Sequence, residues 1–310
     1  MSIELPPEPQ PAKPAEPETP ALVIPKMFEP ESGSQITSYR TSNTYTFEHM
    51  IGEGFFSKVY ACTDMWDNEL AIKILKPRLP VELMREAAQR EFSTLLAVRH
   101  PNVSYTYDAF EFEQNFFIVT ERCLGTVEGL FKLKNFNGMT WFMPIARCLL
   151  QAVHSLHVMQ VAHQDIHLGN VMSAIVKDEM LDAKEAWNFK LCDLGIARML
   201  GELESTDWRK VSITPPEILD PKQFGVLDHR IDIYHTGLVL LQLAKSQRLE
   251  FTKEEILAGK PREIALTLPG PHNVAIEKAL RRRVQFRTAS ALELWRDLNS
   301  PAGLGDAFAQ

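Results

Sequence analysis

The feature that most constrains this chain is a fixed order of charged and amide residues, each placed after an apolar segment. Residues 163–170 read His-Gln-Asp-Ile-His-Leu-Gly-Asn and follow a long helical pattern, and residues 193–195 read Asp-Leu-Gly after the apolar stretch 189–192. Two carboxylates and an amide in this order suit a general base near a hydroxyl, together with oxygen ligands for a hard cation such as Mg²⁺. The series therefore indicates a catalytic site that uses a bound cation.

The first half of the chain carries a glycine-containing loop and two charges on apolar faces. Gly52 and Gly54 lie between two predicted strands, where backbone amides can approach phosphate oxygens without an intervening Cβ. Lys73 lies inside an apolar strand, and Glu91 lies on the apolar stripe of a helix. Since each charge would be costly if buried alone, we predict that they pair and leave the ammonium able to hold a phosphate. Alone, the loop is equally compatible with an ordinary hairpin turn, and the two charges with exposed side chains.

Hydrophobic periodicity predicts strands first and helices afterwards. The predicted strands cover residues 46–50, 59–63 and 70–75, with a two-stranded hairpin over 110–120. Helices are predicted over residues 81–98, 143–160, 232–245, 253–258, 274–282 and 289–298. Strands with one helix, followed by a helical body, predict an α+β fold with two lobes.

Residues 1–44 differ in texture from the rest of the chain. Nine of the 20 prolines lie between positions 6 and 30, among Glu and Ala, and a Ser/Thr/Gln-rich stretch follows. Such a segment buries too little apolar surface to offset its ordering entropy, so a disordered tail is predicted over 1–44. It would serve as a plain tether or as a docking site for a partner. A folded domain is predicted over 45–298, with a C-terminal tail at 299–310.

Charge and cysteine content narrow the class of protein. With 33 Lys+Arg against 40 Asp+Glu, the net charge is −7, which argues against binding nucleic acid through its phosphates. The four cysteines are scattered without a Cys-x-x-Cys pair, as is typical of a reducing compartment. The sequence has no secretory signal pattern and no apolar run of about 20 residues. We therefore expect a cytoplasmic protein without a membrane or nucleic-acid partner.

In this order and at these spacings, the motifs resemble those of the eukaryotic-type protein kinases, from about residue 45 to residue 298. The resemblance implies a bilobal kinase fold with a β-rich N-lobe over 45–121 and a larger α-helical C-lobe over 122–298. It also implies ATP and Mg²⁺ as cofactors and a protein as the phosphate acceptor.

The resemblance further implies roles for individual residues. Asp165 would be the catalytic base, and Lys73 would hold the α- and β-phosphates while pairing with Glu91. His167 stands where serine/threonine kinases generally carry a lysine that steadies the γ-phosphate, and Asn170 and Asp193 would ligate Mg²⁺. The nucleotide-binding residues implied are Ile51, Gly52, Gly54, Ser57, Val59, Ala71, Lys73, Thr120, Glu121 and Cys123.

The chain departs from the family pattern at several positions. Gln164 replaces the arginine before the catalytic Asp, so the usual contact with a phosphorylated activation loop is missing. Leu194 replaces the Phe of Asp-Phe-Gly, an apolar change that can still pack beneath the helix bearing Glu91. The segment between Asn170 and Asp193 is about ten residues longer than usual for the family.

Three functions are compatible with these motifs. The first is an active protein kinase, with serine or threonine favoured as the acceptor. Val211 and Pro215, however, are similar to the residues that tyrosine kinases carry at these positions. The second is a pseudokinase that acts as a nucleotide- or protein-binding module, for which His167 argues. The third is a small-molecule phosphotransferase of the antibiotic-kinase type, against which Glu217, Asp232 and Arg287 argue because that group lacks this triad. The resemblance also implies that Glu217 and Arg287 form a structural ion pair.

Overall fold

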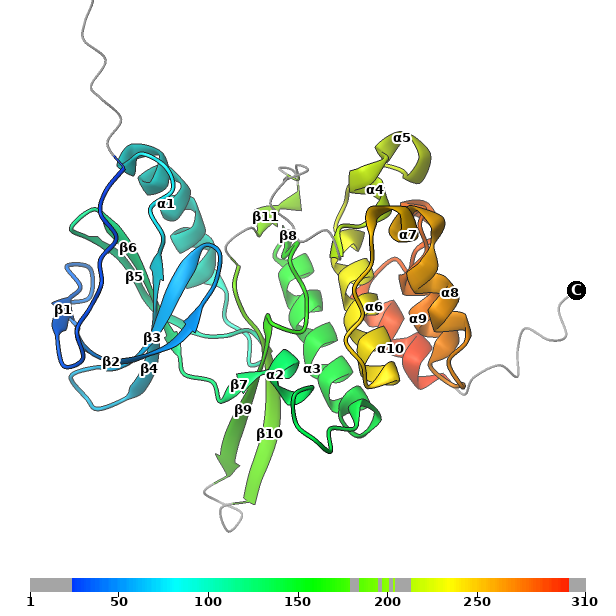
Figure 1. Ribbon diagram of the computed structural model, residues 1–310, viewed down its shortest axis with the longest axis horizontal. Helices are drawn as coiled ribbons and strands as arrows, with labels where there is room; N and C mark the ends of the chain where they lie inside the picture. The colour runs from blue at the N-terminus through cyan, green and yellow to red at the C-terminus, as the bar shows by residue number, and fades with distance from the viewer. Residues whose placement is uncertain (1–23, 179–183, 195–196, 201–202, 204–212, 301–310) are drawn as a thin grey trace, which may run out of the picture.

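The computed structural model describes residues 24–178, 184–194, 197–200, 203 and 213–300. A strand-rich part formed by the first third of the chain stands beside a helical part formed by the rest, which confirms the predicted bilobal α+β fold (Figure 1).

The strand-rich part is a six-stranded antiparallel sheet with the order β1-β2-β3-β4-β6-β5. Its strands are β1 (Gln35–Thr37), β2 (Thr44–Glu53), β3 (Ser57–Thr63), β4 (Glu69–Leu75), β5 (Thr106–Phe112) and β6 (Asn115–Glu121). Its helix α1 (Val81–Ala97) packs through Val81 and Ala88 against Phe116 of β6. The three predicted strands, the hairpin and the helix are thus confirmed. The observed strands are slightly longer than the predicted ones.

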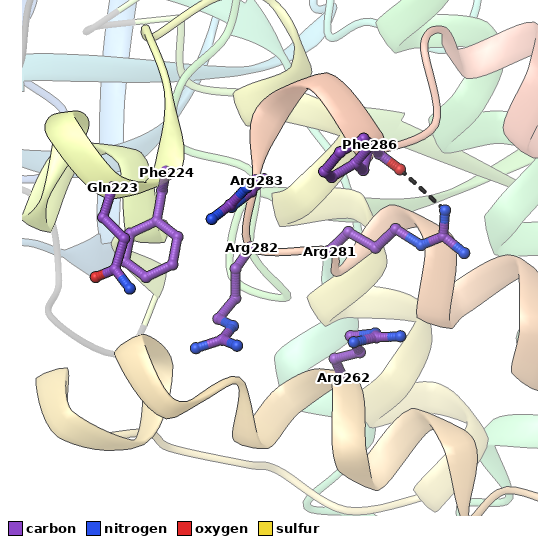
Figure 2. Close-up of a pocket in the computed structure, with 7 residues that line it drawn as sticks. All are labelled: Gln223, Phe224, Arg262, Arg281, Arg282, Arg283 and Phe286. Atoms are coloured by element: carbon purple, nitrogen blue, oxygen red, sulfur yellow. Dashed lines mark hydrogen bonds between the residues drawn. The ribbon is translucent and has the colours of Figure 1, made fainter.

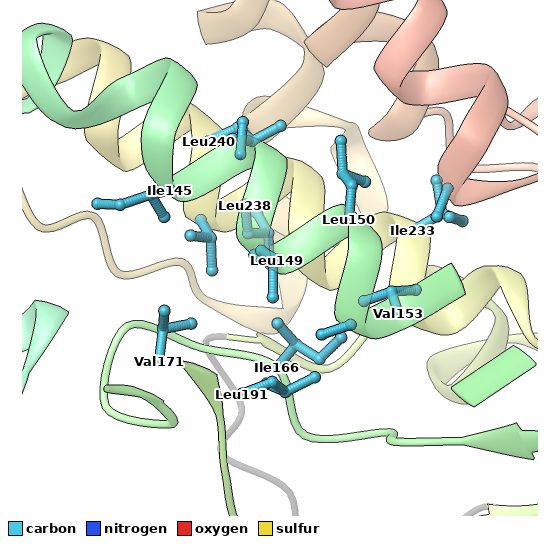
Figure 3. Close-up of a cluster of buried hydrophobic side chains, with 14 of the residues drawn as sticks. Ile145, Leu149, Leu150, Val153, Ile166, Val171, Leu191, Ile233, Leu238 and Leu240 are labelled. Atoms are coloured by element: carbon cyan, nitrogen blue, oxygen red, sulfur yellow. The ribbon is translucent and has the colours of Figure 1, made fainter. Parts of the chain in front are cut away.

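Two apolar helices form the centre of the helical part, α3 (Gly138–Val158) and α6 (Arg230–Lys245). Figure 3 shows Ile145, Leu149 and Val153 of α3 in one buried cluster with leucine and isoleucine side chains of α6. The helix α3 begins earlier than predicted because the side chain of Asn137 accepts the N–H of Met139 and caps it at 3.0 Å.

The start of α3 approaches the end of α6 very closely. A Cβ placed on Gly138 would lie 2.1 Å from the carbonyl oxygen of Leu243, and the Gly138 N–H donates to the Ser246 hydroxyl at 2.8 Å. A glycine is therefore required at this crossing.

Shorter helices complete this part of the molecule. They are α2 (Val127–Leu130), α4 (Pro216–Leu219), α5 (Pro221–Phe224), α7 (Lys253–Ala258), α8 (Lys260–Leu266), α9 (Asn273–Ala279) and α10 (Ala291–Asn299). The sequence predicted α7, α9 and α10 but missed α2, α4, α5 and α8. Only Gly259, at φ 90°, separates α7 from α8. Among the described residues, no helix is long and apolar enough to cross a membrane.

The extra residues between Asn170 and Asp193 form a hairpin that the sequence did not predict. Strands β9 (Val171–Asp178) and β10 (Lys184–Leu191) pair in continuous antiparallel register, and β7 (Gly125–Thr126) pairs with β9. Trp187 of β10 contacts Trp141 of α3, with ring centroids 5.3 Å apart. Strand β8 (Val161–Ala162) pairs with β11 (Arg198–Met199). The hairpin thus extends directly from the segment that carries Asn170.

The predicted disordered tail was wrong for residues 24–44, whereas residues 1–23 lie outside the described part of the chain. Ile36 of β1 is buried, and Phe28 lies against the rings of Phe47 and Phe117. The side chain of Asn115 accepts the Phe28 N–H at 2.9 Å and donates to the Lys26 carbonyl. The burial of Ile36, the packing of Phe28 and the hydrogen bonds of Asn115 therefore order this segment despite its polar composition. We call residues 24–37 the N-terminal strap.

Candidate active site

The segment that carries Asp165 is held by one buried carboxylate on α6. Asp232 accepts the backbone N–H of His163 at 2.8 Å and that of Gln164 at 2.7 Å, and the His157 ring donates to it at 2.9 Å. Burial alone would raise the pKa of Asp232, but the net pKa is lowered because the hydrogen bond and charge of His157, together with contributions from His163 and the Gln164 N–H, outweigh burial. An ionised Asp232 therefore fixes the backbone at the start of this segment.

His163 connects this segment to the residues before Asp193. Its Nδ1 accepts the N–H of Asp165 at 3.2 Å, so Nε2 carries the proton and donates to the Cys192 carbonyl at 2.9 Å. The Cys192 N–H in turn donates to the Asn170 carbonyl at 2.9 Å. These bonds place the backbone of Asp165, Asn170 and Asp193 in one rigid arrangement.

Asp165, Asn170 and His167 lie together on this arrangement. The Asn170 amide donates to the Asp165 carbonyl at 2.9 Å and to its carboxylate at 3.2 Å. The Nε2 of His167 lies 3.8 Å from the Asp165 carboxylate, while its Nδ1 accepts the Gly169 N–H at 3.0 Å. A Cβ on Gly169 would lie 2.9 Å from the His167 ring, so the glycine allows the ring to sit there.

Lys73 reaches across from the sheet to Asp193. It lies in β4 between Val59 of β3 and Ile118 of β6, and its ammonium is 2.5 Å from the Asp193 carboxylate. Asp193 adopts φ 63°, in the left-handed region that aspartate enters more readily than most residues. The predicted partner Glu91 lies on α1, but its side chain is outside the described side chains, so the predicted pairing with Lys73 is not tested.

The glycine-containing loop connects β2 and β3 and is held by two cations that the sequence analysis did not single out. The Gly54 N–H donates to the Ser57 carbonyl at 2.9 Å. Lys76 donates to the Gly54 carbonyl at 2.8 Å. Arg78 donates to the Phe55 carbonyl at 2.7 Å and lies 3.5 Å from the centre of the Phe55 ring. Both cations follow β4, whose end thus fixes the tip of the loop.

The remaining predicted nucleotide-binding residues lie on neighbouring strands of the same sheet, except Cys123, which lies between β6 and β7. Ile51 and Gly52 are in β2, and Ala71 of β4 pairs with Thr120 of β6. Glu121 accepts a bidentate pair of bonds from Lys190 of β10 at 2.7 and 2.8 Å, which ties the sheet to the hairpin. Burial raises the pKa of the Cys123 thiol to about 11, so it is a thiol at neutral pH.

One prediction outside the immediate site is confirmed. Arg287 and Glu217 form a bidentate ion pair at 2.7 and 2.8 Å, and both side chains are fully buried. Leu194 is buried and belongs to the large apolar cluster that also contains Leu95 of α1.

The predicted magnesium ligands form a sparse donor set. Among the described residues, no group of three His, Cys, Asp or Glu side chains could hold a metal ion. Asn170 uses its amide nitrogen in two hydrogen bonds, so the oxygen is the atom it can offer, and Asp193 offers a carboxylate. One carboxylate and one amide fit Mg²⁺ that takes its other ligands from phosphate oxygens and water.

A protein-family comparison decides the family. The model described as "Protein kinase domain" matches residues 45–280, which is more than half of the chain. The chain belongs to the protein kinase family. His163 and Asp232, to which the sequence analysis gave no part in holding Asp165, are the residues that position the Asp165 segment in this kinase.

Curated relatives agree with this assignment, and a solved structure shares the fold. The chain is 26% identical over 205 residues to "Serine/threonine-protein kinase 36" of Pongo abelii, covering 64% of this chain and 14% of that protein. It is 27% identical over 213 residues to "Serine/threonine-protein kinase fused" of Drosophila melanogaster, covering 66% and 24%. The chain thus spans less than two thirds of these relatives. The kinase domain of Mycobacterium tuberculosis PknI, a double mutant, superposes with a TM-score of 0.62 at 18% identity, covering 89% of this chain and 100% of that one.

Proposed function

We propose that this kinase transfers the γ-phosphoryl group of ATP to a serine or threonine hydroxyl of a protein. The observation that carries the proposal is the meeting of Lys73 from the sheet with Asp193, beside the hydrogen-bonded pair Asp165–Asn170. The names of the relatives support serine and threonine as the acceptor class.

In the proposed reaction, Asp165 accepts the proton of the attacking hydroxyl. In the same step, the hydroxyl oxygen forms a bond to the γ-phosphorus, and the bond between that phosphorus and the β,γ-bridging oxygen breaks. Asn170 would hold the Asp165 carboxylate in place through the 3.2 Å bond. When bound, Mg²⁺ would neutralise negative charge on the phosphate oxygens, with Asn170 and Asp193 as its protein ligands. Lys73, now paired with Asp193, would turn to the phosphates once the carboxylate faces the cation.

The test is transfer of radiolabel from γ-labelled ATP, with Mg²⁺, to the protein itself and to a generic basic protein, followed by phosphoamino-acid analysis. We expect labelled phosphoserine or phosphothreonine, and none with Asp165→Asn, which keeps the shape of the side chain but not its basicity. Nucleotide binding by calorimetry is measured in parallel. Binding without transfer would identify a pseudokinase, and label on tyrosine would correct the acceptor.

A further inference from the structure

A cavity of about 330 Å³ lies in the helical part, away from the sheet, between α5, α8 and the segment that follows α9. Figure 2 shows four arginines around it, among the described residues. They are Arg262 of α8 and the consecutive Arg281, Arg282 and Arg283. None of these residues takes part in the candidate active site, so the function of this cavity goes beyond phosphoryl transfer.

Two of the four arginines are held by one buried carboxylate. Glu277 of α9 is only 4% exposed and accepts bonds from both Arg262 and Arg281. Burial would raise the pKa of Glu277, but the two guanidinium groups outweigh it and the net pKa is lowered. The Glu277 carboxylate thus orients two guanidinium groups, and the three side chains together carry a net charge of +1.

The other two arginines add charge without a carboxylate. Arg282 donates to the Leu257 carbonyl at 2.6 Å, and its guanidinium lies 5.6 Å from the centre of the Phe224 ring. Arg283 is exposed and has no ion-pair partner among the described residues. Four arginines and Glu277 give the cluster a net charge of 4 − 1 = +3, on a chain whose net charge is −7.

The lining favours an anionic group carried by a protein segment. Among the described residues that line the cavity none is acidic, and the planar guanidinium fork matches carboxylate and phosphate oxygens in paired hydrogen bonds. Phe286 stands beside the arginines and is 54% exposed, so it offers an apolar surface next to the charge. A side chain that carries an anion, with an apolar neighbour in the same segment, satisfies both features.

We propose that this arginine cavity is a docking site for an acidic segment of a partner protein, which inserts a carboxylate or phosphate between Arg282 and Arg283. The cavity lies apart from the residues that surround Asp165. A partner anchored here would be held by the kinase whether or not it occupies the active site.

The test measures binding without ATP, so its outcome is separate from that of the proposed phosphoryl transfer. The probes are three fluorescent peptides that differ only at a central position flanked by leucines, which holds phosphoserine, glutamate or alanine. Fluorescence anisotropy with the full chain is expected to show the phosphoserine or glutamate peptide binding at least about tenfold more tightly than the alanine peptide. The ratio between the two anionic peptides identifies which source of anion the site prefers.

Variants assign the binding to the cavity. Arg283→Ala is expected to weaken the anionic peptide about fivefold or more, and Arg283→Glu to abolish its advantage over the alanine peptide. Arg283 is exposed, so neither variant should alter the thermal unfolding transition. The matched control is Arg296→Ala, which removes an exposed arginine from α10 and should leave affinity unchanged. Equal affinity for all three peptides, or unchanged binding by Arg283→Ala, would overturn the proposal, as would tighter binding to anionic lipid vesicles than to either anionic peptide.

Discussion

Lys73 of strand β4 carries an ammonium group that contacts the carboxylate of Asp193, which follows strand β10. We expect Lys73→Ala and Asp193→Asn each to remove about 95% or more of phosphoryl transfer, corresponding to roughly 2 kcal/mol of barrier or more. The reason is that each would stabilise charge on the phosphoryl group or its cation. The radiolabel assay checks this, with the exposed Lys245→Ala as the control. Full activity in either variant would contradict the assigned site.

His167 offers a second test at the residue scale. Because its Nδ1 accepts the Gly169 N–H, the proton of the neutral ring lies on Nε2, the side facing Asp165. A donor placed there can bind a phosphate oxygen, so His167→Ala should raise the barrier by roughly 1–3 kcal/mol. His167→Lys, which restores a donor, should retain most of the rate. Steady-state kinetics decides, and equal rates for wild type and His167→Ala would leave the ring without a role.

The identities of the candidate site residues could be predicted from the sequence because each belongs to a motif. Their partners could not. Asp193 contacts Lys73 because strand β4 and the segment after β10 meet in space, which no local pattern reports. The sequence shows Asp232 as an acid at the start of an apolar helix, but its bonds to two backbone amides depend on the packing of α6 against residues 163–170.

At the scale of elements, the end of β4 controls the glycine-containing loop. Removing the guanidinium in Arg78→Ala should free the loop tip and speed nucleotide release about fivefold, on the order of 1 kcal/mol. Stopped-flow release of a fluorescent ATP analogue measures this. Arg99→Ala is the matched control, because Arg99 also stacks on an aromatic ring, Tyr105 at 4.3 Å, and donates to a backbone carbonyl away from the loop. The same release rate in both variants would show that the contact between Arg78 and Phe55 does not control nucleotide release.

The crossing of α3 and α6 predicts a sharp cost for one added methyl group. Gly138→Ala would press a Cβ against the Leu243 carbonyl, so we expect a loss of stability at the upper end of about 1–3 kcal/mol. Gly129→Ala in α2 is the control, since its Cβ would make only an ordinary 3.5 Å contact and alanine favours helix. Urea unfolding compares them. Similar midpoints would mean that the helices separate without penalty.

Elements with clear periodicity were predictable, whereas those set by pairing were not. The strands and main helices follow from apolar spacing at 2 and 3.6 residues. The hairpin β9–β10 was missed because it also depends on packing against α3, through Trp141 and Trp187, which the local sequence pattern does not report. The early start of α3 was missed because the apolar stripe that predicted the helix begins at Ile145, whereas the helix is capped at Asn137.

For the whole molecule, two histidines give stability a defined pH dependence. Burial lowers the pKa of His100, with a further contribution from the charge of His154, and burial also lowers the pKa of His272. The unfolded chain therefore binds protons more readily than the folded one, and stability falls as the pH drops below the usual histidine value of about 6.5.

Urea unfolding at about pH 7.5 and about pH 5.5 should show this fall. The variants His100→Gln and His272→Gln should each reduce the difference between the two conditions, whatever their effect at neutral pH. An unchanged difference in both variants would assign the pH dependence to other groups.

Because of the N-terminal strap, the folded unit begins before the region that matches the protein kinase family. The family match begins at residue 45, yet Phe28 covers Phe47 and Phe117 from outside that range. A polypeptide begun at residue 45 would uncover these aromatic rings and lose the two bonds that Asn115 makes with Phe28 and Lys26. The aromatic patch exposed in this way would favour self-association, so a soluble fragment of this kinase has to start before residue 24.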